Sequence, residues 1–180
     1  MRFSGVWLPA ITPFTRGEID YPAYERLIDH YVKLGVTGII PLGTTGESPT
    51  IDDEEADRVV ERTVATVAGR VPIVVGVGGN DTRKAVKAVK RLQRHAVQGI
   101  LSVCPYYNRP SQDGMHEHFT RIAEATDRPI LIYNIPYRTG VNLGNEAMLR
   151  LASHPNIAGL KDCCADRSQS LELLRGRGQN

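Results

Sequence analysis

Cysteine is scarce in this chain, and its pattern excludes two classes of protein. The 180 residues contain only Cys104, Cys163 and Cys164, and two of these are adjacent. An odd number of cysteines with this spacing gives neither a disulfide framework nor a zinc-ligand motif. We therefore expect reduced thiols in a cytoplasmic protein.

Long apolar runs and an excess of charge of one sign are lacking too. No apolar stretch reaches the roughly 20 residues of a membrane span, and the N-terminal residues lack the pattern of a secretory leader. The 22 basic and 20 acidic residues leave a net charge of +2, so neither nucleic acid nor an anionic membrane is an expected partner. No cluster of histidine, cysteine and carboxylate side chains predicts a metal site.

What the chain does contain is a unit that recurs about every 30 residues, the size of one strand and one helix. An apolar, β-branched run is followed by turn residues and then by an amphipathic stretch that begins at a capping residue. Near-continuous apolar runs are typical of a parallel sheet covered by helices. The six runs are residues 6–13, 36–42, 71–76, 99–104, 129–135 and 157–160. The helices between them are expected to begin near Asp20, Asp52, Asn80, Ser111, Asn145 and Ser168.

Six such units leave two architectures, an open doubly wound sheet and a (β/α)8 barrel of about 250 residues. The glycine-rich segments 43–47 and 76–79 lack the residues of a nucleotide-binding or dinucleotide-binding loop. Polar residues instead follow the second, fourth, fifth and sixth runs, whose ends share one face of a barrel. We therefore predict an α/β fold of the (β/α)8 TIM-barrel type with about the first six units present, as a single incomplete domain over residues 1–180.

The residue types at these strand ends suit imine chemistry on keto acids. Lys161 ends the sixth run, where burial lowers a lysine pKa and frees the neutral amine to attack a carbonyl. Tyr133 lies in the fifth run, on the strand before, and adjacent parallel strands are about 4.8 Å apart, so its phenol could reach Lys161 and move protons during imine formation. Taken alone, each has a commoner explanation: a lysine that reaches solvent, or a core tyrosine with a satisfied hydroxyl.

Three further segments carry candidate binding groups, each with a plain structural alternative. Thr44 and Thr45 follow the second run, where hydroxyls and backbone N–H groups could bind a carboxylate, or where a tight turn simply needs glycine. Tyr107 lies on a proline-bracketed loop that suits an interface, a lid or a packing corner. Arg138 could hold a second carboxylate in two hydrogen bonds, or could be a surface charge.

Together these segments resemble the dihydrodipicolinate synthase family, within the N-acetylneuraminate lyase superfamily. The resemblance covers residues from about 3 to 174 and rests on four motifs in the family's order. They are Gly43-Thr44-Thr45-Gly46-Glu47, Pro105-Tyr106-Tyr107-Asn108-Arg109-Pro110, Tyr133-Asn134-Ile135-Pro136 with Arg138-Thr139-Gly140, and Gly159-Leu160-Lys161-Asp162. The resemblance implies a lyase that condenses pyruvate with L-aspartate 4-semialdehyde on the route to diaminopimelate and lysine, without a cofactor and usually as a dimer of dimers.

The resemblance also implies a role for each motif residue. Lys161 would form the imine with pyruvate, and Tyr133 would donate and accept protons. Thr44 and Tyr107 would complete a proton relay, with Tyr107 reaching into the site of a neighbouring subunit.

Two substrate contacts follow from the same resemblance. Thr45 would bind the pyruvate carboxylate, and Arg138 would receive the carboxylate of the semialdehyde. Arginine followed by Thr-Gly favours a synthase over a neuraminate lyase, although sugar-acid aldolases can share it. A sugar-acid or keto-acid aldolase with the same imine lysine, and an inactive remnant of a longer barrel, therefore remain alternatives.

A departure from the family pattern predicts weak or absent feedback inhibition by lysine. Members that respond to lysine often carry an acidic residue where Lys84 stands, and a like charge there would repel the effector's ammonium group. Activity measured against rising lysine concentration checks this, and potent inhibition at low lysine would contradict it. The family's effector site matches Ser48, Pro49, Asp53, Ala56, Asn80, Lys84 and Tyr106.

Overall fold

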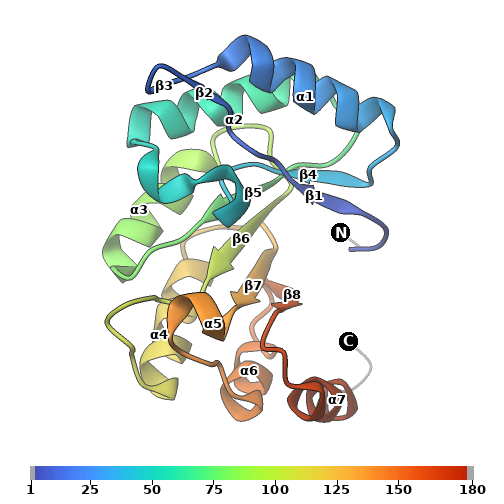
Figure 1. Ribbon diagram of the computed structural model, residues 1–180. Helices are drawn as coiled ribbons and strands as arrows, with labels where there is room; N and C mark the ends of the chain where they lie inside the picture. The colour runs from blue at the N-terminus through green and yellow to red at the C-terminus, as the bar shows by residue number, and fades with distance from the viewer. Residues whose placement is uncertain (1–2, 178–180) are drawn as a thin grey trace. The chain divides into compact units, whose positions relative to one another are not determined.

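The computed structural model describes residues 3–177 as a chain in which parallel strands alternate with helices (Figure 1). The strands that open the six units are β1 (Trp7–Pro9), β4 (Gly38–Ile40), β5 (Val74–Val77), β6 (Gly99–Val103), β7 (Ile130–Asn134) and β8 (Ile157–Asp162). The helices that follow them are α1 (Tyr21–Lys33), α2 (Asp53–Val67), α3 (Thr82–Leu92), α4 (Gln112–Ala123), α6 (Asn145–Leu151) and α7 (Arg167–Gly176). All six runs and helices expected from the sequence are confirmed.

Short elements between these units were not anticipated from the sequence. An antiparallel hairpin of β2 (Phe14–Thr15) and β3 (Glu18–Ile19) precedes α1. Two 3₁₀ turns, η1 (Thr44–Gly46) and η2 (Ser48–Thr50), follow β4, and a single helical turn, α5 (Pro136–Thr139), follows β7. Elements of two to four residues are too short to show a hydrophobic period, so only their turn residues leave a signal.

Side-chain caps explain why the helices begin where they do. Asp52 forms a capping box with Glu55, because its carboxylate accepts from the Glu55 amide while the Glu55 carboxylate accepts from the Asp52 amide. Ser111 caps α4 by accepting from the Gly114 amide, and Asp20 caps α1 by accepting from the Ala23 amide. These caps satisfy amides that have no partner inside the helix.

The described residues form two compact units. Unit 1 comprises residues 3–77 and 91–100, and unit 2 comprises residues 78–90 and 101–177. In unit 1, β1 pairs with β4 in parallel, and an isolated bridge joins Ile39 to Ile73 ahead of β5. Helices α1 and α2 pack together, with a hydrogen bond of 2.7 Å between the buried hydroxyls of Tyr24 and Thr63 (Figure 1).

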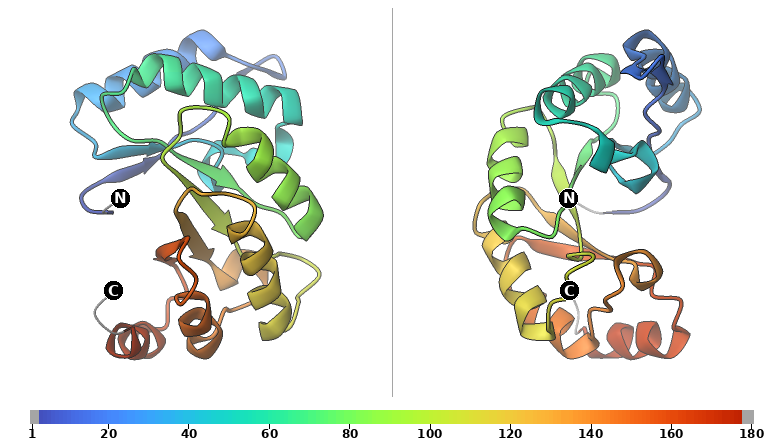
Figure 2. Two further views of the ribbon diagram at one scale, coloured as in Figure 1. Left: turned by 180° about the vertical axis from the view of Figure 1, so that it is seen from behind. Right: turned by 60° about the vertical axis from the view of Figure 1, so that its left-hand side comes forward.

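Unit 2 contains the end of β6, then β7 and β8. The Cys104 amide, just after β6, donates to the Tyr133 carbonyl over 3.0 Å, and β7 pairs with β8 in parallel. Helices α4 and α6 pack against each other, and α4 buries Met115, Phe119 and Ile122 (Figure 2). The prediction that residues 1–180 form a single domain stays a prediction. Within residues 3–177, no helix has both the length and the apolar character that crossing a membrane requires.

Candidate active site

Lys161 and Tyr133 lie side by side at the ends of two neighbouring strands of unit 2. The register of the parallel pair β7–β8 sets Tyr133 directly beside Lys161, so both side chains leave the same face of the sheet. The Lys161 ammonium nitrogen is 4.0 Å from the centre of the Tyr133 ring. Tyr133 is buried, with 7% of its surface exposed, and Lys161 is half-buried. The two residues that the sequence predicted on adjacent strands are therefore in contact.

Burial shifts the protonation of both groups in directions that suit carbonyl chemistry. Loss of solvent lowers the Lys161 pKa, because an ammonium ion is less well stabilised away from water. Burial also raises the pKa of Tyr133 to about 12, and the neighbouring Cys163 and Tyr137 add to that increase, while Arg138 opposes it. At neutral pH the phenol therefore keeps its proton, whereas the amine loses its proton more readily than a solvated lysine would.

Arg138 lies in the turn that leaves β7. It belongs to α5, is exposed, and places its guanidinium 5.6 Å from the centre of the Tyr137 ring. The buried Thr139 fixes this turn, because its hydroxyl donates to the carbonyls of Ile135 and Val141. A free guanidinium on a fixed turn is suited to binding a carboxylate.

Tyr107 lies on a loop of unit 2 that is attached to this turn. Its backbone has φ of 73° and its side chain is 89% exposed. The Tyr107 amide donates to the Thr139 carbonyl over 3.4 Å, and Arg109 Nε donates to the Gly140 carbonyl over 3.0 Å. Hydrogen bonds to the α5 turn therefore fix the loop, and the Tyr107 phenol points into solvent.

Thr44 and Thr45 belong to unit 1, apart in sequence from the other predicted residues. Both are exposed on η1, whose Gly46 amide donates to the Gly43 carbonyl over 3.0 Å. The buried Thr12 hydroxyl donates to the Gly46 carbonyl over 2.8 Å and anchors the turn to the segment after β1. The other four predicted residues, Lys161, Tyr133, Tyr107 and Arg138, are in unit 2.

Sequence reasoning assigned no site role to two residues that border the Lys161–Tyr133 pair. Asn134 is 1% exposed, and its amide side chain binds the Asn142 side chain over 2.8 Å and the Leu143 amide over 3.1 Å, which ties the loop after α5 to β7. Cys163 donates its backbone N–H to the Asn134 carbonyl over 2.8 Å, which extends the pairing of the two strands one residue past Asp162. The sequence signal for Asn134 was its membership of the Tyr133-Asn134-Ile135-Pro136 motif, and that for Cys163 was its position next to Asp162.

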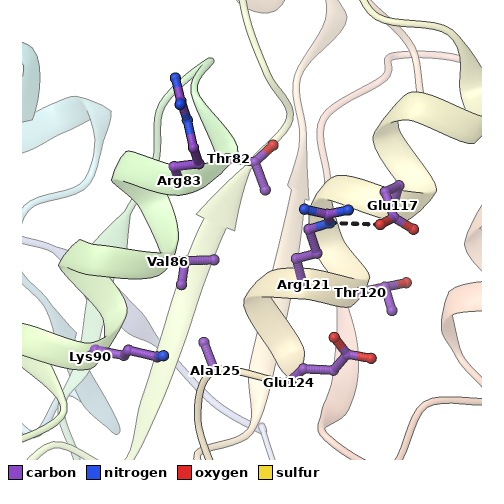
Figure 3. Close-up of a pocket in the computed structure, with 9 residues that line it drawn as sticks. All are labelled: Thr82, Arg83, Val86, Lys90, Glu117, Thr120, Arg121, Glu124 and Ala125. Atoms are coloured by element: carbon purple, nitrogen blue, oxygen red, sulfur yellow. Dashed lines mark hydrogen bonds and ion pairs between the residues drawn. The ribbon is translucent and has the colours of Figure 1, made fainter.

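A groove in unit 2 between α3 and α4 lies away from these residues (Figure 3). It has a volume of about 590 Å³, and its charged side chains are of both signs, with Glu117 and Arg121 paired at 2.6 Å. None of the residues predicted to carry the chemistry lines it. Among residues 3–177, no group of three or more histidine, cysteine or acidic side chains is placed to hold a metal ion.

Alternating parallel strands and helices, with a half-buried lysine at a strand end, define an α/β chain of the barrel-enzyme class. The chain belongs to the Dihydrodipicolinate synthetase family, whose model matches residues 2–180.

Named relatives agree with this assignment. A curated relative, 4-hydroxy-tetrahydrodipicolinate synthase 2 of Clostridium acetobutylicum, is 51% identical over 180 residues, which are all of this chain and 63% of the relative. The 4-hydroxy-tetrahydrodipicolinate synthase of Leptospira biflexa is 44% identical over 96% of this chain and 58% of its own length. The crystal structure of dihydrodipicolinate synthase from Aquifex aeolicus superposes with a TM-score of 0.95 at 40% identity, over 98% of this chain and 61% of that chain.

The chain thus spans about three-fifths of the length of the relatives that it matches. Its six strand–helix units are three-quarters of the eight that close a barrel of this type. The predicted fold class, a TIM-barrel type with about the first six units present, is confirmed.

Proposed function

We propose that this chain carries the imine-forming part of a 4-hydroxy-tetrahydrodipicolinate synthase. The reaction would condense pyruvate with L-aspartate 4-semialdehyde, on the route to diaminopimelate and lysine. The observation that carries the proposal is the pairing of Lys161 with Tyr133, with 4.0 Å between the lysine nitrogen and the ring centre. The covalent imine would replace a cofactor, and three free cysteines suit a cytoplasmic location.

In the first step the neutral Lys161 amine would add to the C2 carbonyl of pyruvate. The resulting carbinolamine would lose water to give the imine, so that one C–O double bond is exchanged for one C–N double bond and a water molecule. Tyr133 would give its proton to the departing hydroxyl and recover one from the nitrogen. A phenol that is protonated at neutral pH, beside an amine with a lowered pKa, is suited to both tasks.

Four other residues would complete the site. Thr44 would complete a proton relay from Tyr133 together with the Tyr107 phenol that a neighbouring subunit supplies, and both side chains are exposed. Thr45 would bind the pyruvate carboxylate, and Arg138 would hold the carboxylate of the semialdehyde in two charge-assisted hydrogen bonds. Because Tyr107 is 89% exposed, we extend the proposal to a homo-oligomer in which this phenol enters a neighbouring subunit.

The test is a comparison of substrates on the purified chain. Pyruvate consumption with L-aspartate 4-semialdehyde is measured beside cleavage of 2-keto-3-deoxy sugar acids and N-acetylneuraminate. Turnover of the semialdehyde alone supports the synthase. Preferred cleavage of a sugar acid would replace it with an aldolase of the same superfamily, and a folded chain that turns over none of them would be an inactive remnant.

Replacing Tyr133 with phenylalanine is expected to slow formation of the pyruvate imine by about 10²–10⁴-fold, the usual contribution of a positioned proton donor. The rate is followed by borohydride reduction and intact-protein mass spectrometry. Tyr31→Phe is the matched control, because Tyr31 lies on α1 in unit 1 and is not among the groups that act on Tyr133 or Lys161. Equal rates in the two variants would contradict the role of the Tyr133 hydroxyl.

A further inference from the structure

A network of three side-chain amides runs through unit 2 from the end of β7 to the start of α7. Asn134, which directly follows Tyr133, is buried, and its Nδ2 donates to Asn142 Oδ1 over 2.8 Å. Asn142 Nδ2 in turn donates to Gln169 Oε1 over 2.7 Å, and Gln169 Nε2 donates back to Asn142 Oδ1 over 3.3 Å. This amide network, made of Asn134, Asn142 and Gln169, therefore joins β7, the loop after α5 and α7.

Each amide of the network faces partners of the opposite kind. Gln169 Nε2 also donates to the Leu143 carbonyl over 2.9 Å, and the Leu143 amide donates to Asn134 Oδ1 over 3.1 Å. Leu143 is thus held by β7 through its amide and by α7 through its carbonyl. Turning any one of the three side-chain amides over would set donor against donor or acceptor against acceptor, so the network has one arrangement.

The α7 end of the network is anchored to β8, the strand that carries Lys161. Ser170, next to Gln169 on α7, donates its hydroxyl to the carboxylate of Asp162 at the end of β8. Asp166 caps α7 and accepts from the Gln169 amide over 3.2 Å, which fixes the turn that carries Gln169. The start of α7 therefore holds β8 directly and holds β7 through the amide network.

We propose that Gln169 is a positioning residue for imine formation, whose amide holds the end of β7 where Tyr133 lies beside Lys161. The proposal rests on the imine chemistry proposed above, and it adds a residue from a helix to a site built on two strands. Gln169 itself touches no substrate, and it acts on the reaction only through the amide network.

Loss of the Gln169 amide would loosen β7 beside the reacting groups. Past Tyr133, the hydrogen bond from the Cys163 amide to the Asn134 carbonyl, 2.8 Å long, joins the two strands. If the Asn134 side chain is less firmly held, this bond opens more often, and Tyr133 spends less time beside Lys161. Imine formation then slows, because a small displacement of a reacting group lowers the rate. Thr45, proposed to bind the pyruvate carboxylate, lies in unit 1 and is not part of the network.

Two single variants remove the hydrogen bonds in different ways. Gln169→Leu removes both the donor and the acceptor of the side chain. Gln169→Glu keeps its shape but sets a carboxylate oxygen against Asn142 Oδ1 and the Leu143 carbonyl, where Nε2 now donates. A negative charge in the first turn of a helix favours that helix, so a defect in Gln169→Glu is not explained by loss of α7.

A double variant and a control complete the set. Asn142→Asp combined with Gln169→Arg restores a donor and an acceptor, because the guanidinium can donate both to the new carboxylate and to the Leu143 carbonyl. Ser168→Leu is the matched control, since it introduces a leucine at an exposed position on the same turn of α7. Circular dichroism with urea denaturation reports whether each variant is folded.

The rate of borohydride-trapped pyruvate adduct on Lys161 is measured for every variant and the unaltered chain across a series of pyruvate concentrations. We expect both single variants to lower the maximal rate about threefold to tenfold, the effect of one lost amide hydrogen bond. The pyruvate concentration that gives half the maximal rate should not change. The double variant should recover most of the lost rate, and Ser168→Leu should match the unaltered chain.

Amide hydrogen exchange gives a second readout that does not depend on the reaction. The amides of Leu143 and Cys163 both donate to Asn134, so the peptides that contain them report how firmly Asn134 is held. Exchange of these amides should be about threefold to tenfold faster in the Gln169→Leu and Gln169→Glu variants. It should return towards the original rate in the double variant.

The outcomes distinguish this proposal from the function on which it rests. An unchanged maximal rate in both single variants overturns the role of Gln169 and leaves the imine chemistry standing. A slower rate that the double variant does not restore, or a shifted half-saturating pyruvate concentration, also overturns it. No adduct in the unaltered chain rejects the imine function and the role of Gln169 with it. If Gln169→Leu does not fold, the rate and exchange of Gln169→Glu decide.

Discussion

Replacing Lys161 with alanine is expected to abolish the borohydride-trapped pyruvate adduct completely. The imine needs a primary amine, and burial beside Tyr133 lowers the pKa of the half-buried Lys161 amine. Lys161→Arg should give the same result, because a guanidinium remains protonated and forms no imine under these conditions. Intact-protein mass spectrometry reports whether an adduct forms, and peptide mapping reports where.

A lysine on the helical surface supplies the control for this experiment. Lys87 is exposed on α3, so Lys87→Ala should leave the adduct at its full level. If an adduct persists in Lys161→Ala and maps to another lysine, the imine forms on that lysine and the assignment to Lys161 is wrong. Loss of adduct in both variants would indicate damage to the fold and not to the site.

The second large effect is expected for Gly76→Ala in unit 1, which should destabilise that unit by about 3 kcal/mol or more, at or above the upper end for overpacking. A methyl group at position 76 would lie 2.1 Å from the Leu42 carbonyl oxygen and 2.8 Å from the Gly43 nitrogen. Both are backbone atoms, and the Gly76 amide is itself bonded to the Pro41 carbonyl over 2.8 Å, so neither strand can yield without losing its pairing.

Gly43→Ala is the matched control. Gly43 lies next to Gly76, but a methyl group added at position 43 meets no other atom. Its φ of −78° suits any residue, and no atom lies within 4 Å of an added methyl group. Urea denaturation of both variants, followed by circular dichroism, gives the change in unfolding free energy. A transition for Gly76→Ala that coincides with that of Gly43→Ala would contradict the predicted clash.

The sequence predicted the repeating units well because their signals are local. Asp20 caps the helix that it was expected to cap, α2 and α4 begin next to Asp52 and Ser111 as expected, and Lys161 lies one residue before the end of β8. The hairpin of β2 and β3 was not predicted because its four residues are too few to show a hydrophobic period, and the single turn of α5, which Pro136 opens, was not predicted for the same reason.

The candidate site was predictable only as a set of residues on neighbouring strands. Their adjacency followed from the order of the strands, but the direct pairing of Tyr133 with Lys161 depends on a register that has a shift between Ile130 and Leu131. The position of Cys163 next to β7 depends on one further backbone hydrogen bond past the strand, from its amide to the Asn134 carbonyl. From the sequence alone, Cys163 was therefore predicted only to be a small buried side chain.

The loop that carries Tyr107 is attached to the α5 turn that carries Arg138, so the positions of these two residues are coupled. The Thr139 carbonyl and the Gly140 carbonyl hold the loop, and the buried Thr139 hydroxyl holds the turn. If Arg138 moves when it binds an acidic substrate, these hydrogen bonds would therefore transmit the movement to the loop that carries Tyr107. Binding of an acidic substrate in one subunit would therefore be linked to the position of the phenol that the same subunit supplies to its neighbour.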